Sequence, residues 1–224
     1  QAYVQEVLAR YPLLAETLVH LFLTRFDPDL EEGQRPAAVA RHERTLSAEL
    51  ARIANLDEDR ILRGFAAVVA ASLRTNFFQT GADGAPKPIL SIKLDPAQIP
   101  DLPKPRPKFE IFVCSQRVEA VHLRMSDVAR GGIRWSDRRE DFRTEILGLM
   151  KAQQVKNTVI VPNGAKGGFV CKRLPPGDDR EAQRREAVEC YKSFIRGLLD
   201  LTDNIVDGEI VRPARVVAGD HDDP

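Results

Sequence analysis

The sequence predicts an α/β fold, in which a helical first third is followed by a mixed sheet flanked by helices. Two observations indicate this class. Through most of residues 1–80, apolar side chains recur every three or four positions, which is typical of amphipathic helices. The pattern changes over residues 88–224. Short strands with a period of two residues come first and give this part an α+β-like beginning. Alternating helices and buried strands follow. We therefore expect two parts, 1–80 and 88–224.

The first part is expected to contain three helical segments. Residues 2 to about 25 have helical spacing, and we expect Pro12 to kink this helix or to begin a second one. Another helix is expected at about 37–54. A third is expected at 57–78, with Asp57 as its cap and further acids in its first turn, where the helix dipole favours them. No chemistry is recognisable here, so packing or assembly is the expected role.

The second part begins with strands. Alternation of apolar and polar residues predicts strands at 89–94, 109–115 and 118–125, the last two as a hairpin. The proline-rich segment 99–109 between them is expected to be an ordered connection.

Helices and one more strand are expected further on. Residues 136–157 should form a helix, for which Ser136 and Asp137 are candidate caps. A short buried strand is expected at 158–162 and an amphipathic helix at 178–204. This alternation predicts helices packed on a sheet.

Composition excludes several classes of function. The chain has 224 residues with 33 basic and 33 acidic side chains, so no bulk charge attracts nucleic acid or a membrane. No apolar run is long enough to span a bilayer. The three cysteines are far apart, which indicates a reducing, cytoplasmic compartment, and neither they nor the four histidines have metal-ligand spacing. We expect no metal site.

Both ends of the sequence predict a piece of a longer protein. The chain begins "QAYVQEV", without methionine or a signal peptide, and it finishes in the acidic string "AGDHDDP".

Basic residues are concentrated between 129 and 173. This stretch contains ten basic and four acidic residues in a chain of zero net charge, which predicts an anion site. A solvated helix face is the alternative, and we favour it for Arg138, Arg139 and Lys151.

Two glycine-containing motifs in this stretch favour a binding site. In "RGGIRW", Gly131 and Gly132 allow the backbone to approach a ligand closely, and the guanidinium of Arg134 suits a carboxylate. In "PNGAKGG", glycines clear the space around Lys166. A confined lysine near other cations favours the neutral amine, which can act as a general base.

Spacing excludes two nucleotide-binding motifs. A P-loop requires a Gly-Lys pair followed by Ser or Thr, whereas here Ala165 precedes Lys166 and Gly167 follows it. The GxGxxG fingerprint is absent from the sequence. A basic anion-binding pocket is the interpretation that remains.

The block "VARGGIRWSDRREDFRTEILGLMKAQQVKNTVIVPNGAKGGFVCKR" (128–173) closely resembles the large bacterial NAD-specific glutamate dehydrogenases, and the resemblance extends from about residue 88 to the end. It implies that 88–224 is part of the substrate-binding catalytic domain of an oligomeric enzyme. The implied reaction is oxidative deamination of L-glutamate to 2-oxoglutarate and ammonia, with NAD as hydride acceptor. NAD would be bound by a domain missing from this chain, so the isolated chain should be inactive.

The resemblance also implies roles for individual residues. Lys166 matches the catalytic lysine, which activates the water that attacks the iminium carbon. Lys156 matches the lysine that binds the substrate α-carboxylate. Gly132 and Arg134 lie in the segment that lines the substrate pocket.

Two features depart from the family pattern. No lysine falls where the family binds the side-chain carboxylate, so Arg143 is our candidate for that role, with Thr144 and Lys151 as alternatives. The segment that carries the family's catalytic aspartate is also absent, and we expect Asp220 to precede that residue.

A different class of function stays open. The chain could instead be a non-catalytic module that binds a dicarboxylate, with its helical part mediating oligomerisation.

Overall fold

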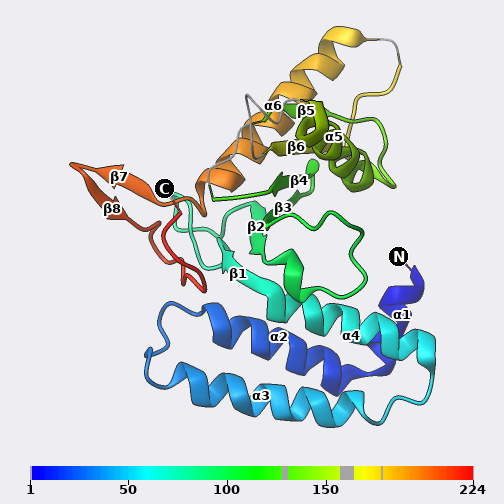
Figure 1. The fold of residues 1–224 in the computed structure, drawn as a ribbon, viewed down its shortest axis with the longest axis vertical. Coiled ribbons are helices and arrows are strands. Elements are labelled where there is room, and N and C mark those ends of the chain that lie inside the picture. Colours follow the sequence, from blue (N-terminus) through cyan, green and yellow to red (C-terminus); the bar gives the residue numbers. More distant parts are fainter. Residues whose placement is uncertain (1, 128–130, 157–163, 178, 224) are drawn as a thin grey trace.

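The computed structural model describes residues 2–127, 131–156, 164–177 and 179–223. Its centre is a six-stranded mixed sheet with the strand order β1-β2-β3-β4-β6-β5 (Figure 1). Neighbouring strands are antiparallel except for the parallel pair β5 and β6. The predicted α/β fold with a mixed sheet and flanking helices is confirmed.

The predicted strands at 89–94, 109–115 and 118–125 are confirmed, the last two as an antiparallel pair. The strands of the sheet are β1 (Ser72–Thr75), β2 (Ile89–Leu94), β3 (Phe109–Ser115), β4 (Val118–Arg124), β5 (Ile133–Trp135) and β6 (Ala165–Cys171).

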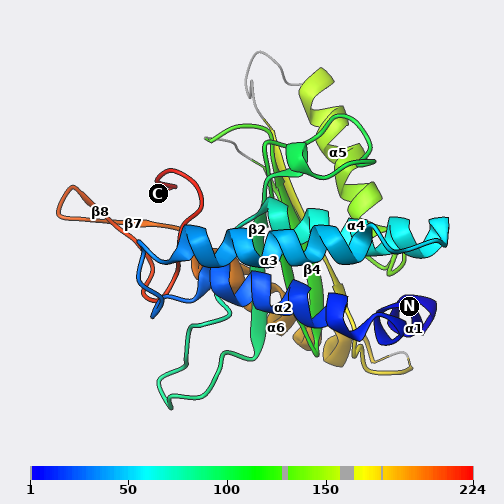
Figure 2. The same cartoon turned by 90° about the horizontal axis from the view of Figure 1, so that it is seen from below.

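Two helices cover opposite faces of this sheet (Figure 2). One is α5 (Phe142–Lys156), whose Ile146 and Met150 form a core with Val121 and Val170 of the strands. The other is α6 (Arg180–Leu199), whose buried residues pack against the other face, in a core that includes Val113 and Phe169. Each face therefore has its own hydrophobic core, as a sheet between two helical layers requires.

The first part of the chain forms a helical layer beside β1 (Figure 1). Its helices are α1 (Ala2–Arg10), α2 (Pro12–Phe26), α3 (Arg35–Leu50) and α4 (Leu56–Ala71). Pro12 begins α2, which is bent by 98° from α1, so the predicted break is confirmed. Among the described residues, no single helix is both long and apolar enough to cross a membrane.

The expected helix at 57–78 was wrong at both ends. Asn55 caps α4, because its side-chain oxygen accepts hydrogen bonds from the amides of Asp57 (2.9 Å) and Glu58 (3.2 Å). The helix stops at Ala71, and Ser72–Thr75 forms the edge strand β1 paired with β2. The spacing of apolar residues stays helical through Ser72–Thr75, but pairing with β2 gives these residues the backbone hydrogen bonds of a strand.

Other boundaries also differ from the predictions. The expected caps Ser136 and Asp137 do not begin α5, because the amide of Ser136 donates to the carbonyl of Phe169 (2.8 Å) and prolongs the β5–β6 pairing. Helix α6 begins at Arg180, capped by Asp179, and it ends at Leu199 rather than at 204. The predicted strand at 158–162 lies outside the described residues.

One hairpin was not predicted. Strands β7 (Asn204–Val206) and β8 (Glu209–Val211) form a separate two-stranded sheet that projects from the body of the molecule (Figure 1). Asp207 (φ 52°) and Gly208 (φ 85°) form its turn. An Asp-Gly pair is a strong hairpin signal, and the sequence contained it.

The glycines after Lys166 allow helices to pack on both faces of β6. A Cβ on Gly168 would overlap the side chain of Ile146 in α5. A Cβ on Gly167 would lie 3.3 Å from Phe194 of α6 and 3.0 Å from Ile133. Packing therefore requires a glycine at 168 and favours one at 167, and the space that we expected these glycines to leave for a ligand stays a prediction.

A cluster of buried ion pairs fixes the last residues of the chain to the sheet. Asp220 accepts hydrogen bonds from Arg74 (2.6 Å) and Lys93 (2.5 Å). Asp223 accepts from Lys93 and Arg124, both at 2.6 Å. Arg74 also pairs with Asp203 at 2.7 Å. We call these six residues, three cations and three carboxylates, the buried ion cluster.

Substitution of Gly168 tests the packing of α5. Gly168→Ala should lower the free energy of unfolding by about 1–3 kcal/mol, because the new methyl group overpacks the contact with Ile146. Gly148→Ala in α5 is the control, since nothing lies within 4 Å of its Cβ position, and it should be neutral or stabilising by up to about 1 kcal/mol. Urea denaturation measures both, and equal effects would contradict the packing explanation.

Substitutions of Asp220 and Asp222 test how much the buried ion cluster contributes to stability. Asp220→Ala leaves Arg74 and Lys93 without a shared partner, so it should cost about 3–5 kcal/mol of stability. Asp222 pairs with Arg212 at the surface (3.0 Å), so Asp222→Ala should cost about 0–1 kcal/mol. The two variants can be compared by thermal and chemical denaturation. A loss below about 1 kcal/mol for Asp220→Ala would be inconsistent with a structural role for the cluster.

Candidate functional site

Lys166 lies near the start of β6, between the neighbouring strands β4 and β5. It is paired with Leu123 of β4, and its side chain is half-buried. Within the described part of the chain, its ammonium group has neither an ion pair nor a hydrogen bond. A cation in this state is available to a ligand, and the same region of the sheet holds two other predicted residues, Gly132 and Arg134.

Arg134 lies on the same face of the sheet as Lys166. It is the β5 partner of Gly168, and Gly168 faces α5. Lys166 is two residues from Gly168 on β6, so the pleat of the strand directs its side chain to that face as well. Gly132 lies alongside, and its carbonyl accepts a hydrogen bond from the amide of Gly167 (3.1 Å). Three predicted residues therefore lie together at this edge of the sheet.

Glu145 holds the guanidinium of Arg134. The Nε of Arg134 lies 2.6 Å from a carboxylate oxygen of Glu145 in α5, and the hydroxyl of Ser136 donates to the other oxygen at 2.5 Å. The Arg134 side chain is still 55% exposed, so its remaining donors face solvent. Neither Glu145 nor Ser136 was predicted to take part in the site.

Gly131 has the close backbone approach that the motif predicted. A Cβ there would overlap the carbonyl oxygen of Ala165, the residue before Lys166. The approach is to the chain's own backbone, and it brings the β5 segment against the start of β6.

Arg143, our candidate for the side-chain carboxylate, already has a partner. It forms two hydrogen bonds to the carboxylate of Glu110 in β3, at 2.8 and 2.6 Å. Glu110 is buried, so a substrate carboxylate would have to displace it. The alternatives Thr144 and Lys151 are exposed on α5. The assignment of Arg143 stays a prediction, with Glu110 as its competitor.

Lys156 is the last residue of α5, and its side chain is not among those that the structure describes. Its predicted contact with the α-carboxylate therefore stays a prediction. Asp220 is bound to Arg74 and Lys93 in the buried ion cluster, so its two oxygens are occupied.

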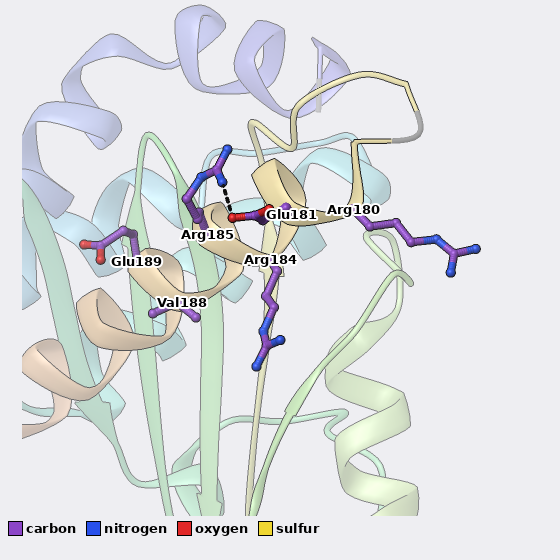
Figure 3. Close-up of a pocket in the computed structure, with 6 residues that line it drawn as sticks. All are labelled: Arg180, Glu181, Arg184, Arg185, Val188 and Glu189. Atoms are coloured by element: carbon purple, nitrogen blue, oxygen red, sulfur yellow. Dashed lines mark hydrogen bonds and ion pairs between the residues drawn. The ribbon is translucent and has the colours of Figure 1, made fainter.

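The hollow shown in Figure 3 does not contain these residues. It has a volume of about 740 Å³ and is lined by side chains of α6 alone, among them Arg180, Arg184 and the ion pair between Arg185 and Glu181. Arg180 and Arg184 point in different directions in this view. A hollow along one side of a single helix lacks the converging groups of a binding pocket.

The described residues do not fit a dinucleotide. In the β5–α5–β6 unit, whose two strands are parallel, residues 136–141 connect β5 to α5 without a glycine. A pyrophosphate needs a glycine-rich turn at that place. In the described part of the chain no group of three or more His, Cys, Asp and Glu residues is arranged to hold a metal ion.

The arrangement can bind an anion and move a proton. Lys166 offers an unpaired amine, and Arg134 offers a guanidinium beside it on the same face of the sheet. A lysine can neutralise a carboxylate or act as an acid or base. The fold and these side chains define a small α/β domain that carries two cations on one face at an edge of its sheet.

Comparison with known proteins then gives the family. The family described as "Bacterial NAD-glutamate dehydrogenase, catalytic domain" matches residues 45–224. This chain belongs to that family, and the resemblance noted in the sequence is confirmed.

Relatives match the whole chain. It is 53% identical over 224 residues to a protein from Halomonas elongata named NAD-specific glutamate dehydrogenase. Proteins of the same name from Pseudomonas aeruginosa and Mycobacterium tuberculosis are each 52% identical, over 99% and 100% of the chain. The chain spans 14% of the length of each of these three relatives.

The pH dependence of stability tests the packing beside Lys166. His122 is paired with Gly167, and burial, with a smaller effect of Arg124, lowers its pKa to about 4, although Asp223 opposes this. The unfolded chain has a His pKa of about 6.5. Because the unfolded state binds the extra proton between these values, stability is complete above about pH 6.5 and falls towards pH 4, by about 1–3 kcal/mol.

The variant His122→Gln isolates this contribution. It should have a flatter dependence of the unfolding free energy on pH between about 6.5 and 4, whatever its stability at pH 7. Urea titrations at several pH values measure the slope, and an unchanged slope would show that His122 is not buried in its neutral form.

Proposed function

We propose that this chain carries the substrate-binding side of the active site of an NAD-dependent glutamate dehydrogenase. The enzyme would deaminate L-glutamate oxidatively to 2-oxoglutarate and ammonia. The observation that carries this proposal is the half-buried Lys166, which has no partner among the described residues and lies on the same face as Arg134, in a chain whose relatives are named NAD-specific glutamate dehydrogenase.

In this proposal Lys166 performs the proton transfer. In its neutral form the amine takes a proton from the water whose oxygen bonds to the iminium carbon, which gives a carbinolamine. The resulting ammonium passes that proton to the substrate nitrogen, so that the C–N bond breaks, ammonia leaves and the hydroxyl loses its proton to form the carbonyl. Packing of α5 and α6 against Gly168 and Gly167 supports this role, because it fixes the backbone next to Lys166.

Contacts to the two carboxylates of the substrate would orient it in the site. Lys156 would bind the α-carboxylate and Arg143 the side-chain carboxylate, after displacing Glu110. Arg134 and Gly132 would line the pocket, and Glu145 would keep the guanidinium of Arg134 in place.

NAD would accept the hydride when bound. Because the described residues do not fit a dinucleotide, we assign no step of the hydride transfer to them. A homo-oligomeric, cytoplasmic enzyme is also part of the proposal. The three free cysteines support a reducing compartment.

Replacement of Lys166 tests this function in the full-length enzyme that contains the chain. Lys166→Ala should lower kcat for glutamate oxidation by at least about 100-fold, because the general base is lost. Lys192→Ala is the control, since Lys192 is exposed on α6 and pairs with Glu189 at the surface, and it should leave kcat within about twofold of the wild type. NADH absorbance gives the rates, and circular dichroism checks the fold.

The same assay separates catalysis from binding alone. If Lys166→Ala retained normal kcat, the chain would be better described as a non-catalytic dicarboxylate-binding module. A normal KM for L-glutamate together with a collapsed kcat would fit the proposed role of Lys166 in the chemical step.

A further inference from the structure

Glu145 lies in the first turn of α5, over the face of the sheet that carries Arg134 and Lys166. Its side chain is only 12% exposed, so its charge needs partners, and both of its oxygens have one. One oxygen lies 2.6 Å from Nε of Arg134, and the other accepts a hydrogen bond from the hydroxyl of Ser136 at 2.5 Å. Glu145 therefore joins α5 to β5 and to the residue that follows this strand.

Ser136, the second partner of Glu145, is itself fixed. It is buried, and its amide donates a hydrogen bond to the carbonyl of Phe169 in β6 at 2.8 Å. Its hydroxyl oxygen accepts a hydrogen bond from the amide of Arg138 at 3.1 Å. The hydroxyl proton is therefore directed to Glu145, and Glu145 could turn away from Arg134 only by leaving a buried hydroxyl without its acceptor.

The backbone that carries Glu145 is fixed as well. The next residue, Ile146, is fully buried, and its side chain fills the place that a Cβ on Gly168 would take. Gly168 is also the β6 partner of Arg134 in β5. Both members of the Arg134–Glu145 pair are therefore held against the same residue of β6, two positions after Lys166.

The ion pair decides which donors of Arg134 a ligand meets. Its Nε is turned towards Glu145, and none of the residues that the structure describes accepts a hydrogen bond from its two terminal nitrogens. These terminal N–H groups lie in one plane and match the two oxygens of a carboxylate. Because Glu145 holds the guanidinium before a ligand arrives, less side-chain freedom is lost on binding.

The same ion pair reduces the net charge of the site. The charges of Arg134 and Glu145 cancel, so Arg134 contributes directed donors, whereas Lys166 contributes the uncompensated positive charge. An inorganic anion that is attracted mainly by charge gains little from a neutralised arginine. A carboxylate gains more, because it uses the planar pair of donors.

We propose that Glu145 is a positioning residue that sets which anions the site accepts. It holds Arg134 with its terminal nitrogens free and cancels its charge, so that the carboxylate of an amino or oxo acid binds in preference to inorganic anions. Ser136 assists by holding Glu145. This inference rests on the proposed function, in which Arg134 lines the substrate pocket.

Steady-state kinetics of Glu145→Gln in the full-length enzyme that contains the chain test this inference. Glutamine keeps the size and can still accept from Ser136, but it removes the charge. KM for L-glutamate should rise by about fivefold or more, while kcat stays within about threefold of the wild type. The inhibition constant of inorganic phosphate should fall by about threefold or more, because Arg134 regains an uncompensated charge.

Two further variants accompany it. Glu189→Gln is the matched control, because Glu189 pairs with Lys192 on the exposed side of α6, and it should change neither constant. Ser136→Ala frees Glu145 without removing it and should raise KM for L-glutamate by about twofold. It provides a second test should Glu145→Gln not fold, which circular dichroism shows.

A double-mutant cycle shows whether Glu145 acts through Arg134. Arg134→Lys keeps the charge but removes the planar pair of donors. In that background Glu145→Gln should change KM by less than about twofold, because nothing is left to position. Two results would overturn the inference: unchanged KM and phosphate inhibition in Glu145→Gln, or an equal effect of this substitution in both backgrounds.

The readouts also separate this inference from the proposed function. The proposed function is judged by kcat of Lys166→Ala, whereas the role of Glu145 is judged by KM and by phosphate inhibition. A collapsed kcat in Lys166→Ala together with unchanged constants in Glu145→Gln would therefore overturn the role of Glu145 alone.

Discussion

The buried ion cluster is the interaction on which the arrangement of the chain depends. Arg74 in β1, Lys93 in β2 and Arg124 in β4 point into one region that has almost no access to water. Burial raises the pKa of Asp223, but hydrogen bonds from Lys93 and Arg124 outweigh this and leave the pKa below its ordinary value. A buried charge without a partner is very costly. The edge strand, the sheet and residues 203–223 are therefore constrained together.

A second constraint acts at β6, where structure and candidate function meet. Gly168 allows α5 to approach the strand so closely that a Cβ there would overlap Ile146, and a Cβ on Gly167 would be in tight contact with Phe194 of α6. The strand is thus fixed from both sides, and Lys166 lies just before the clamped residues. The glycines therefore serve packing, and they fix the backbone next to the residue from which the Lys166 side chain extends.

The sequence predicted the elements that follow from the spacing of neighbouring apolar, polar and proline residues. Period-two alternation gave β2, β3 and β4, and proline gave the break between α1 and α2. It failed at β1, where "SLRT" follows an apolar helix without a break. The partners of Arg74 in this strand are Asp203 and Asp220, more than 120 residues away, and no window of the sequence contains both sides of that interaction.

The residues of the candidate site also differ in whether the sequence could predict them. Lys166, Gly132 and Arg134 were found because glycines and cations cluster within short motifs. Glu110 was missed because its pairing with Arg143 joins a strand to a helix 33 residues later. Motifs therefore predict sites built within one segment, whereas a site assembled from segments far apart becomes visible only in the fold.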